Sequence, residues 1–212
     1  MQQHAMSDRL VAAFDNALRT LTHKPPGTGR PSPAAGMPMC DLSEAEKRHS
    51  AGLMRVNHAG EVAAQALYQG QALATSHWKH REVLLQAAQE ESDHLRWTAE
   101  RLDALDSRPS LLAPLWYAGA FVLGFVAGKM SPAVAMGFVS ETEKQVEAHL
   151  KGHLSTLPHS DQASRAIVEA MAEDEAAHGQ SAREMGGQTL PMPIEQAMRQ
   201  SAKLMTKTAY FI

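Results

Sequence analysis

The chain has 212 residues, which is enough for one domain with a sizeable hydrophobic core. Its composition is rich in Ala, Leu, Met, Glu and Gln and only 5% aromatic, as is typical of helical proteins. A net charge of −3 leaves no strongly basic surface, which argues against a nucleic acid as the main partner. Cys40 is the only cysteine, so an intrachain disulfide is excluded and a reducing compartment is favoured.

The first 42 residues are predicted to form a short helix followed by a linker. Residues 7–21 place apolar side chains on one side of a helix, with Ser7 as the candidate N-cap (Leu10, Phe14, Leu18 and Leu21). Residues 22–41 contain five prolines and three glycines, and nothing in this linker indicates chemistry. Residues 43–46, Ser-Glu-Ala-Glu, match a capping box and predict the start of a long helix. We therefore divide the chain into residues 1–42 and a main domain of residues 43–212.

Four long helices are predicted in the main domain, and each has a stripe of period 3.6 in which a carboxylate lies among apolar side chains. They cover residues 43–75, 78–105, 132–157 and the stretch from the turn at 158–160 to residue 185. The second and fourth helices add a histidine one turn after the carboxylate, on the same face. In chain order the polar members of the stripes are Glu61, Glu91, His94, Glu143, Glu175 and His178. On the third helix, Glu141 faces away from the stripe, whereas Glu147 borders it and is the alternative to Glu143.

The spacing of these residues predicts that they meet at one level of a bundle. The carboxylates of the first two helices are 30 residues apart, and those of the last two are 32 apart. The midpoints fall near residues 76 and 159, where turns are expected on independent grounds. Residues equidistant from the turn of an antiparallel hairpin lie at the same height. Two hairpins packed face to face would therefore bring four carboxylates and two imidazoles into one layer.

This set of side chains is that of the ferritin-like di-metal carboxylate proteins, in which two helices supply one Glu each and two supply Glu-x-x-His. Two divalent cations neutralise four carboxylates in a buried layer. Oxygen and imidazole ligands suit iron, although affinity alone does not exclude other first-row metals. One Glu-x-x-His is more often an exposed pair, but the repeated pair with two matching glutamates favours a metal site. The predicted fold is all-α: a ferritin-like four-helix bundle with an apolar crossover helix and short flanking helices at both termini.

The connection between the two hairpins is unusually apolar. Residues 111–128 contain no charged side chain, and their length is at the lower edge of the roughly 20 residues that span a bilayer. A helix that is apolar all round needs either burial or lipid. Burial on the bundle is one interpretation, and we favour contact with lipid. Whether the helix spans the bilayer or only lies on it stays open.

Four motifs carry a resemblance to a known family: residues 55–61 (RVNHAGE), 91–95 (ESDHL), 114–116 (PLW) and 174–178 (DEAAH). They resemble the demethoxyubiquinone hydroxylase family (3-demethoxyubiquinol 3-hydroxylase, or 2-polyprenyl-3-methyl-6-methoxy-1,4-benzoquinone monooxygenase), whose members are ferritin-like di-iron carboxylate proteins. The resemblance covers residues 53 to about 186. It places the iron ligands of the family on the same six residues that the stripes select, and it supports Glu143 through its position six residues before His149.

The resemblance implies a di-iron monooxygenase that hydroxylates the ring of a demethoxyubiquinol, a polyprenyl methoxy-methyl benzoquinol, in ubiquinone biosynthesis. It implies two Fe ions per chain and O2 as co-substrate, with no catalytic residue beyond the metal ligands. The electron donor stays open between the quinol itself and a reduced nicotinamide. The expected partners are the polyprenyl quinol, a membrane surface, other ubiquinone-biosynthesis proteins and further copies of the chain in a homo-oligomer. The expected location is peripheral or monotopic, on the cytoplasmic face of a bacterial cell membrane.

Two other classes of function stay open as alternatives. One is a ferritin- or rubrerythrin-like bundle for iron storage or peroxide handling, and the other is a metal-free helical partner protein at the membrane surface. Around the six stripe residues, Glu90, Asp174 and His149 are candidates to support the ligands, because ligand histidines usually donate their second N–H to a neighbouring carboxylate. A solvated charge is the alternative for each of the three. His58 is interpreted as a structural or supporting residue.

Overall fold

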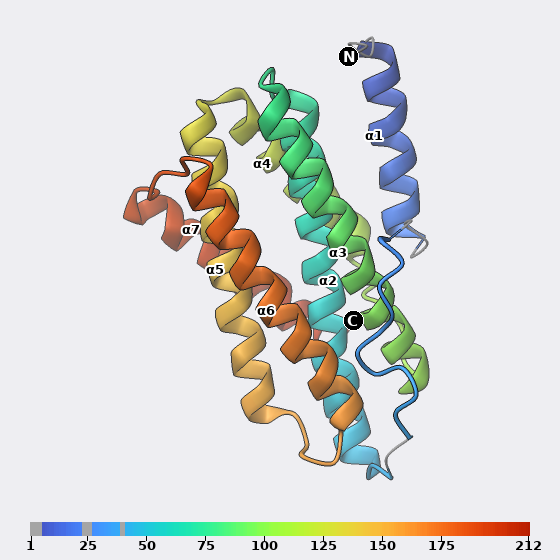
Figure 1. Ribbon diagram of the computed structural model, residues 1–212. Coiled ribbons are helices and arrows are strands. Elements are labelled where there is room, and N and C mark those ends of the chain that lie inside the picture. The colour runs from blue at the N-terminus through green and yellow to red at the C-terminus, as the bar shows by residue number, and fades with distance from the viewer. Residues whose placement is uncertain (1–5, 23–26, 39–40) are drawn as a thin grey trace.

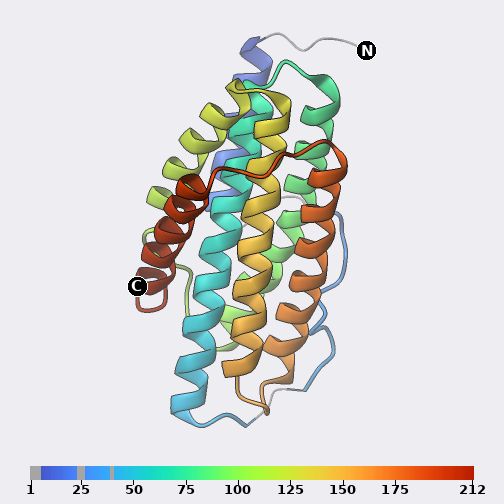
Figure 2. The same ribbon diagram turned by 90° about the vertical axis from the view of Figure 1, so that its left-hand side faces the viewer.

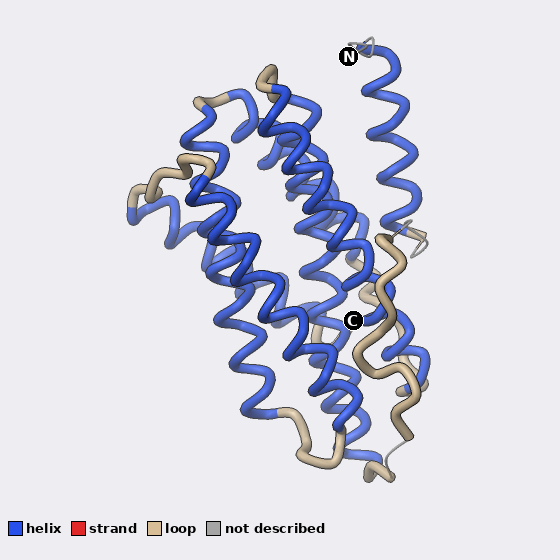
Figure 3. The backbone as a smooth tube through the Cα atoms, viewed as in Figure 1, coloured by secondary structure: helices blue, strands red, loops and turns tan. Residues whose placement is uncertain are grey.

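The computed structural model describes residues 6–22, 27–38 and 41–212, and within these ranges it consists of helices joined by loops, without a strand (Figures 1 and 3). The predicted all-α fold is confirmed. Cys40 and the first two prolines of the predicted linker lie outside the described residues. The helices are α1 (Met6–Leu21), α2 (Glu44–Ala74), α3 (Trp78–Ala104), α4 (Ala113–Lys129), α5 (Pro132–Thr156), α6 (Gln162–Glu184) and α7 (Met192–Ala209).

Local sequence signals determine where the helices begin and end. The capping box before α2 is formed: the Ser43 side chain accepts the Glu46 N–H, and the Glu46 carboxylate accepts the Ser43 N–H at 2.9 Å. Serine and aspartate side chains cap α5 and α6. Gly186, with a φ of 88°, follows the end of α6. The prediction of Ser7 as an N-cap is wrong, because α1 already begins one residue earlier.

The hairpins α2–α3 and α5–α6 form the four-helix bundle (Figures 1 and 2). Two apolar clusters fill it at different heights. One includes Trp97, Leu102 and Met171, and the other includes Tyr68 and Met136. Along all four helices the polar members of the stripes fall between these two clusters. The bundle therefore has a polar layer with apolar packing above and below it.

The crossover helix α4 packs lengthwise on the outside of α2 (Figure 2). Glycines let the two backbones touch, because a Cβ on Gly124 would lie only 2.2 Å from the Leu67 carbonyl oxygen. The other side of α4 is exposed and apolar (Leu115, Val122, Leu123, Phe125 and Val126). One face of α4 is thus buried on the bundle, and the other is open to whatever surrounds the protein. No helix in the described ranges has the length and hydropathy needed to cross a membrane.

The N-terminal segment packs on the bundle in an unexpected orientation. The apolar side of α1 faces outward, so that Phe14 is 67% exposed and Leu10 and Leu18 are exposed as well. The inner side is mixed, since Ala17 and Leu21 pack against an apolar cluster formed by α2, α3 and α4. Arg9 donates to the Ala72 carbonyl near the end of α2 (3.0 Å), an acceptor that a helix end leaves without a helical partner. The segment of residues 27–38 then lies beside α3 (Figure 1). The division of the chain at residue 42 stays a prediction.

Candidate metal centre

Four of the six stripe residues converge on one point of the polar layer. Glu61, Glu91, His94 and Glu175 come from α2, α3 and α6, and each offers a ligand atom within 4.8 Å of the others. All four side chains are buried, with at most 2% of each exposed. Such a concentration of buried carboxylates is costly unless cations or protons neutralise it. The helical periodicity of the sequence is the reason that these residues share the bundle interior.

His94 is the centre of this group. Its Nδ1 lies 2.8 Å from Glu91 Oε2 and 3.4 Å from Glu175 Oε1, and it lies 3.6 Å from Glu61 Oε2. One imidazole nitrogen therefore faces carboxylates from three helices. Because α6 belongs to the other hairpin, the two halves of the bundle meet here, as the spacing of the sequence predicted.

The remaining two stripe residues lie next to this group. His178 Nδ1 is 3.0 Å from Glu91 Oε1 and 3.7 Å from Glu175 Oε2. Glu143 shares a hydrogen bond with Glu175 and also accepts one from the hydroxyl of Tyr68. The two oxygens of Glu91 thus face different imidazoles. The structure brings all six predicted residues into one layer.

The second nitrogen of each imidazole meets a carboxylate from the opposite hairpin. His94 Nε2 donates to Asp174 Oδ2 on α6 (2.9 Å), and His178 Nε2 donates to Glu90 Oε2 on α3 (2.8 Å). These contacts fix the orientation of both rings and leave Nδ1 facing the centre of the layer, as in the supported histidines of metal sites. Asp174 and Glu90 are the carboxylates that directly precede Glu175 and Glu91.

Burial, neighbouring carboxylates and the two imidazoles shift the pKa values of the four glutamates. Burial raises the pKa of Glu61 and Glu143 well above the usual value, and neighbouring carboxylates raise it further. Burial also acts to raise the pKa of Glu91 and Glu175, but the two imidazoles hold both pKa values below the usual value. The carboxylates in turn raise the pKa of both imidazoles, although burial opposes it.

Unpaired oxygen atoms show that the layer suits cations. Glu61 Oε2, Glu91 Oε1, Glu143 Oε2 and Glu175 Oε2 are buried and make no hydrogen bond of good geometry, although three of them lie 3.0–3.7 Å from an imidazole Nδ1. Buried polar atoms are nearly always satisfied in native proteins, so a set of four in one place indicates a missing partner. Carboxylate oxygens and imidazole nitrogens are ligands of first-row metal ions. The chemistry of the residues present therefore fits a two-metal site.

The alternative acids on α5 do not join the layer. Glu141 is buried elsewhere, where it pairs with Lys144 at 2.9 Å. Glu147 is partly exposed and pairs with Lys151 at 2.6 Å. Glu143 is thus the carboxylate of α5 that the structure brings to the other five residues. His58 is fully buried beside the layer on α2 but is not among the convergent ligand atoms.

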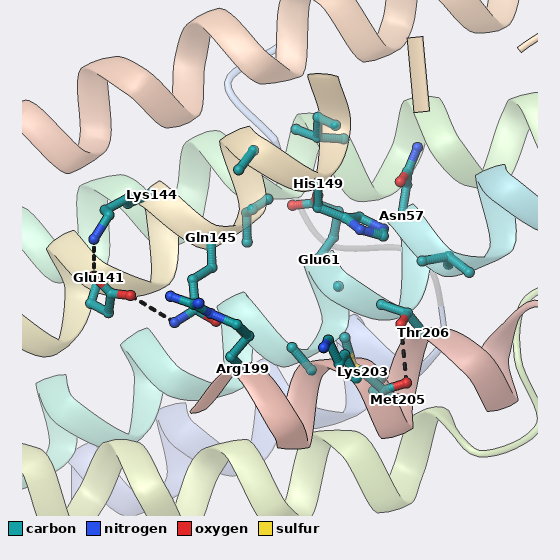
Figure 4. A pocket seen from close by; sticks show the side chains of 16 residues that line it. Asn57, Glu61, Glu141, Lys144, Gln145, His149, Arg199, Lys203, Met205 and Thr206 are labelled. Carbon is teal, nitrogen blue, oxygen red and sulfur yellow. Dashed lines mark hydrogen bonds and ion pairs between the residues drawn. The ribbon is translucent and has the colours of Figure 1, made fainter. Parts of the chain in front are cut away.

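A cavity of about 410 Å³ opens beside the layer, between α2, α5 and α7 (Figure 4). Glu61 lies in its wall together with Asn57 and His149, and Arg199 and Lys203 of α7 line its other side. His149 is therefore a wall residue of the cavity rather than a neighbour of the imidazoles. Its Nε2 and the side-chain oxygen of Asn57 have no hydrogen-bond partner and almost no accessible surface, so neither atom is open to the cavity in this conformation.

Sequence reasoning missed two residues that touch this layer. Tyr68 lies two turns after Glu61 on the same face of α2, but periodicity does not distinguish its hydroxyl from that of any other core tyrosine. Arg30 lies in the predicted linker, yet its guanidinium binds Asp174 at 2.5 Å. No periodicity marks a residue outside a helix, so nothing in the sequence pointed to this contact.

Comparison with known proteins supports the assignment of fold and family. A dodecameric thioferritin, the bacterioferritin-related protein from Bacteroides fragilis, has the same fold with a TM-score of 0.55, covering 73% of this chain and 90% of that one at 15% identity. Proteins named 3-demethoxyubiquinol 3-hydroxylase are 55% identical over 210 residues in Burkholderia mallei and Burkholderia pseudomallei, and 54% identical in Burkholderia thailandensis. Each alignment covers 97% of this chain and 99% of the relative.

The fold and the site define a ferritin-like helical bundle with a buried carboxylate–histidine cluster suited to metal ions. Residues 48–209 match the family described as "Ubiquinone biosynthesis protein COQ7". The chain belongs to this family, which confirms the resemblance that the motifs indicated. A function in iron storage or peroxide handling is not favoured, because the similar curated proteins are hydroxylases over nearly their full length.

Proposed function

We propose that this protein is an O2-dependent di-iron monooxygenase that hydroxylates the ring of a demethoxyubiquinol in ubiquinone biosynthesis. The observation that carries the proposal is the buried layer of four carboxylates and two imidazoles, with unpaired oxygens and a cavity at its side. The names of the full-length relatives supply the reaction.

The six stripe residues would hold two ferrous ions, which supply reductive activation of dioxygen. The protein's own contribution is positioning and exclusion of water. Asp174 and Glu90 hold the two imidazoles with their Nδ1 atoms toward the layer. The apolar clusters above and below the layer keep bulk water away from the candidate ligands, which strengthens the electrostatic interactions inside the site.

The quinol ring is proposed to enter the cavity beside Glu61. Its volume of about 410 Å³ falls in the range of small-molecule sites. The side chains of Asn57 and His149 line this cavity and each carries a polar atom without a partner, so they are proposed to reorient and meet the ring hydroxyls. The methyl and isoprenoid groups would contact the apolar wall, which includes Val56, Val146 and Leu150.

A polyisoprenoid substrate resides in a bilayer, so the protein is proposed to bind the membrane surface as a peripheral or monotopic protein. The exposed apolar side of α4 and the outward apolar side of α1 support this, because such faces bury in the lipid interface. We place it on the cytoplasmic face of a bacterial membrane. A homo-oligomer and contacts with other ubiquinone-biosynthesis proteins belong to the same proposal.

The test is turnover by the full-length protein reconstituted with Fe(II) and assayed with O2, a reductant and a demethoxyquinol in phosphatidylcholine vesicles. Mass spectrometry should show the ring-hydroxylated quinol, and elemental analysis about two iron ions per chain. Glu143→Ala should lose iron and product. Its matched control, Glu147→Ala, should keep both, since Glu147 is partly exposed, pairs with Lys151, and lies outside both the layer and the cavity. A loaded wild-type protein without product would refute the reaction, and equal iron loss in both variants would refute the assignment of Glu143.

A further inference from the structure

The segment that follows α1 is tied to α3 by its backbone and side chains. The Thr28 N–H donates to Asp93 Oδ2 at 3.1 Å, and the Thr28 hydroxyl donates to the same oxygen. Gly27 allows this close approach, because a Cβ there would lie 2.2 Å from Asp93 Oδ1. Asp93 directly precedes His94, so the segment is anchored beside the candidate metal centre.

Arg30 is held at both of its ends. Its carbonyl accepts hydrogen bonds from Arg96 (2.5 Å) and from the indole of Trp97 (3.4 Å), both on α3. Its guanidinium donates to Asp174 on α6 (2.5 Å) and lies 5.0 Å from the centre of the Trp97 ring. A single residue of the predicted linker thus joins the two helices that carry the Glu-x-x-His pairs.

The oxygen that Arg30 binds is the one that orients His94. Asp174 Oδ2 accepts both the guanidinium and the His94 Nε2–H. Trp97, which packs under the guanidinium, also lies against the His94 ring, with ring centres 5.3 Å apart. Arg30 therefore reaches the imidazole through one shared atom and through one shared aromatic neighbour.

We propose that Arg30 is a positioning residue of the metal centre, which locks Asp174 against His94 and joins α3 to α6 where the two hairpins meet. The proposal rests on the metal centre of the proposed function. α3 and α6 carry four of the six candidate ligands, so their separation sets the size of the layer. Residues 27–30 thus connect α3 to α6 at the contact between the two hairpins.

An ordinary surface ion pair is the competing explanation, since the Arg30 side chain is 47% exposed and that of Asp174 is 24% exposed. Exposed pairs contribute little and can be removed without consequence. The Arg30 pair differs because its carbonyl is anchored and its acceptor already holds a buried imidazole. Without the guanidinium, Asp174 can rotate away from His94, and loss of such outer support weakens metal binding by about 10–100-fold.

The test compares full-length, iron-loaded proteins: wild type, Arg30→Gln, Arg30→Lys, Asp174→Asn and the double variant Arg30→Gln/Asp174→Asn. The rate of Fe(II) loss to a colorimetric chelator is measured, with the circular dichroism spectrum to verify folding. Arg19→Gln is the matched control, because it removes an exposed ion pair on α1 with the same change of charge. We expect about tenfold faster iron loss in Arg30→Gln, an intermediate rate in Arg30→Lys, and no change in the control.

The double variant decides whether Arg30 acts through Asp174. Iron loss should be no faster than in Asp174→Asn alone. In that single variant Arg30 has already lost the carboxylate that it binds, so removing the guanidinium as well should have no further effect. Fully additive effects, or a rate in Arg30→Gln equal to that of the control, would overturn the proposal. If Arg30→Gln does not fold, Arg30→Lys carries the comparison, and an unchanged rate in it has the same meaning. A wild-type protein that takes up no iron would instead overturn the metal centre itself.

Discussion

His153 is a buried imidazole without a function in the metal layer. It is 7% exposed, its Nδ1 has no hydrogen-bond partner, and its ring centre lies 4.0 Å from that of His149 on the preceding turn of α5. Burial, together with the neighbouring rings of His149 and His49, lowers the pKa of His153 to about 3. A second cationic ring at this distance would repel the first, so the folded state keeps His153 neutral.

This residue should make the metal-free protein sensitive to mild acid. In the unfolded chain His153 takes up a proton near pH 6.5, whereas in the folded state it does so near pH 3, so stability is complete above 6.5 and falls as the pH decreases toward 3. Between pH 7 and pH 5 this group alone should cost about 2 kcal/mol. Urea unfolding at both pH values should show a smaller loss in His153→Gln than in wild type. Equal losses would contradict the burial effect.

At the residue scale, helical periodicity predicted which side chains of a helix face the bundle interior. It gave no information on the contacts that loop residues make. Glu61 and Glu175 could be placed in the layer because residues three or four apart share a helix face. Arg30 could not, since its contact with Asp174 joins residues 144 positions apart through a segment without periodicity. Periodicity is consistent with Tyr68 inside the bundle, but a stripe does not show which core hydroxyl faces a carboxylate.

At the element scale, the position of α4 depends on glycines rather than on amphipathicity. A helix that is apolar on all sides gives no preference for the face that it buries, which is why the sequence left burial and lipid contact as competing interpretations. Gly70 of α2 and Gly124 of α4 select the buried face, because they let the two backbones approach. The hydrophobic periodicity of α1 also did not predict its orientation. Its apolar side faces outward, and Arg9 binds the end of α2.

A pair of alanine substitutions on α4 should separate packing from helix propensity. In Gly124→Ala the new methyl group would lie 2.2 Å from the backbone of Leu67, which cannot move aside, so α4 must shift from α2. Such overpacking costs about 1–3 kcal/mol. Gly119→Ala is the matched control, because nothing lies within 4 Å of its Cβ position, and a helical alanine should stabilise by about 0.5–1 kcal/mol. Thermal unfolding measures both, and equal shifts would contradict the close contact.

At the scale of the whole molecule, the bundle gathers four buried carboxylates and two imidazoles in one layer between two apolar clusters. The sequence predicted that two divalent cations neutralise this layer. The pKa directions add that protons can do the same: the pKa values of Glu61, Glu143 and both imidazoles are raised, whereas those of Glu91 and Glu175 are lowered. The layer can therefore be neutralised either by two divalent cations or by protons. When metal ions bind, they replace the protons.

This exchange should be measurable as proton release. Metal ligands must be deprotonated, so uptake of two divalent ions at neutral pH should release about four protons, two from glutamic acids and two from imidazoles. Calorimetric titration with Fe(II) under anaerobic conditions, in two buffers of different ionisation enthalpy, gives the number. Glu141→Ala should release the same number, because Glu141 pairs with Lys144 outside the layer. Binding of two ions with the release of one proton or none would contradict the balance of charges, since the layer would then carry a buried excess of positive charge that the apolar clusters cannot solvate.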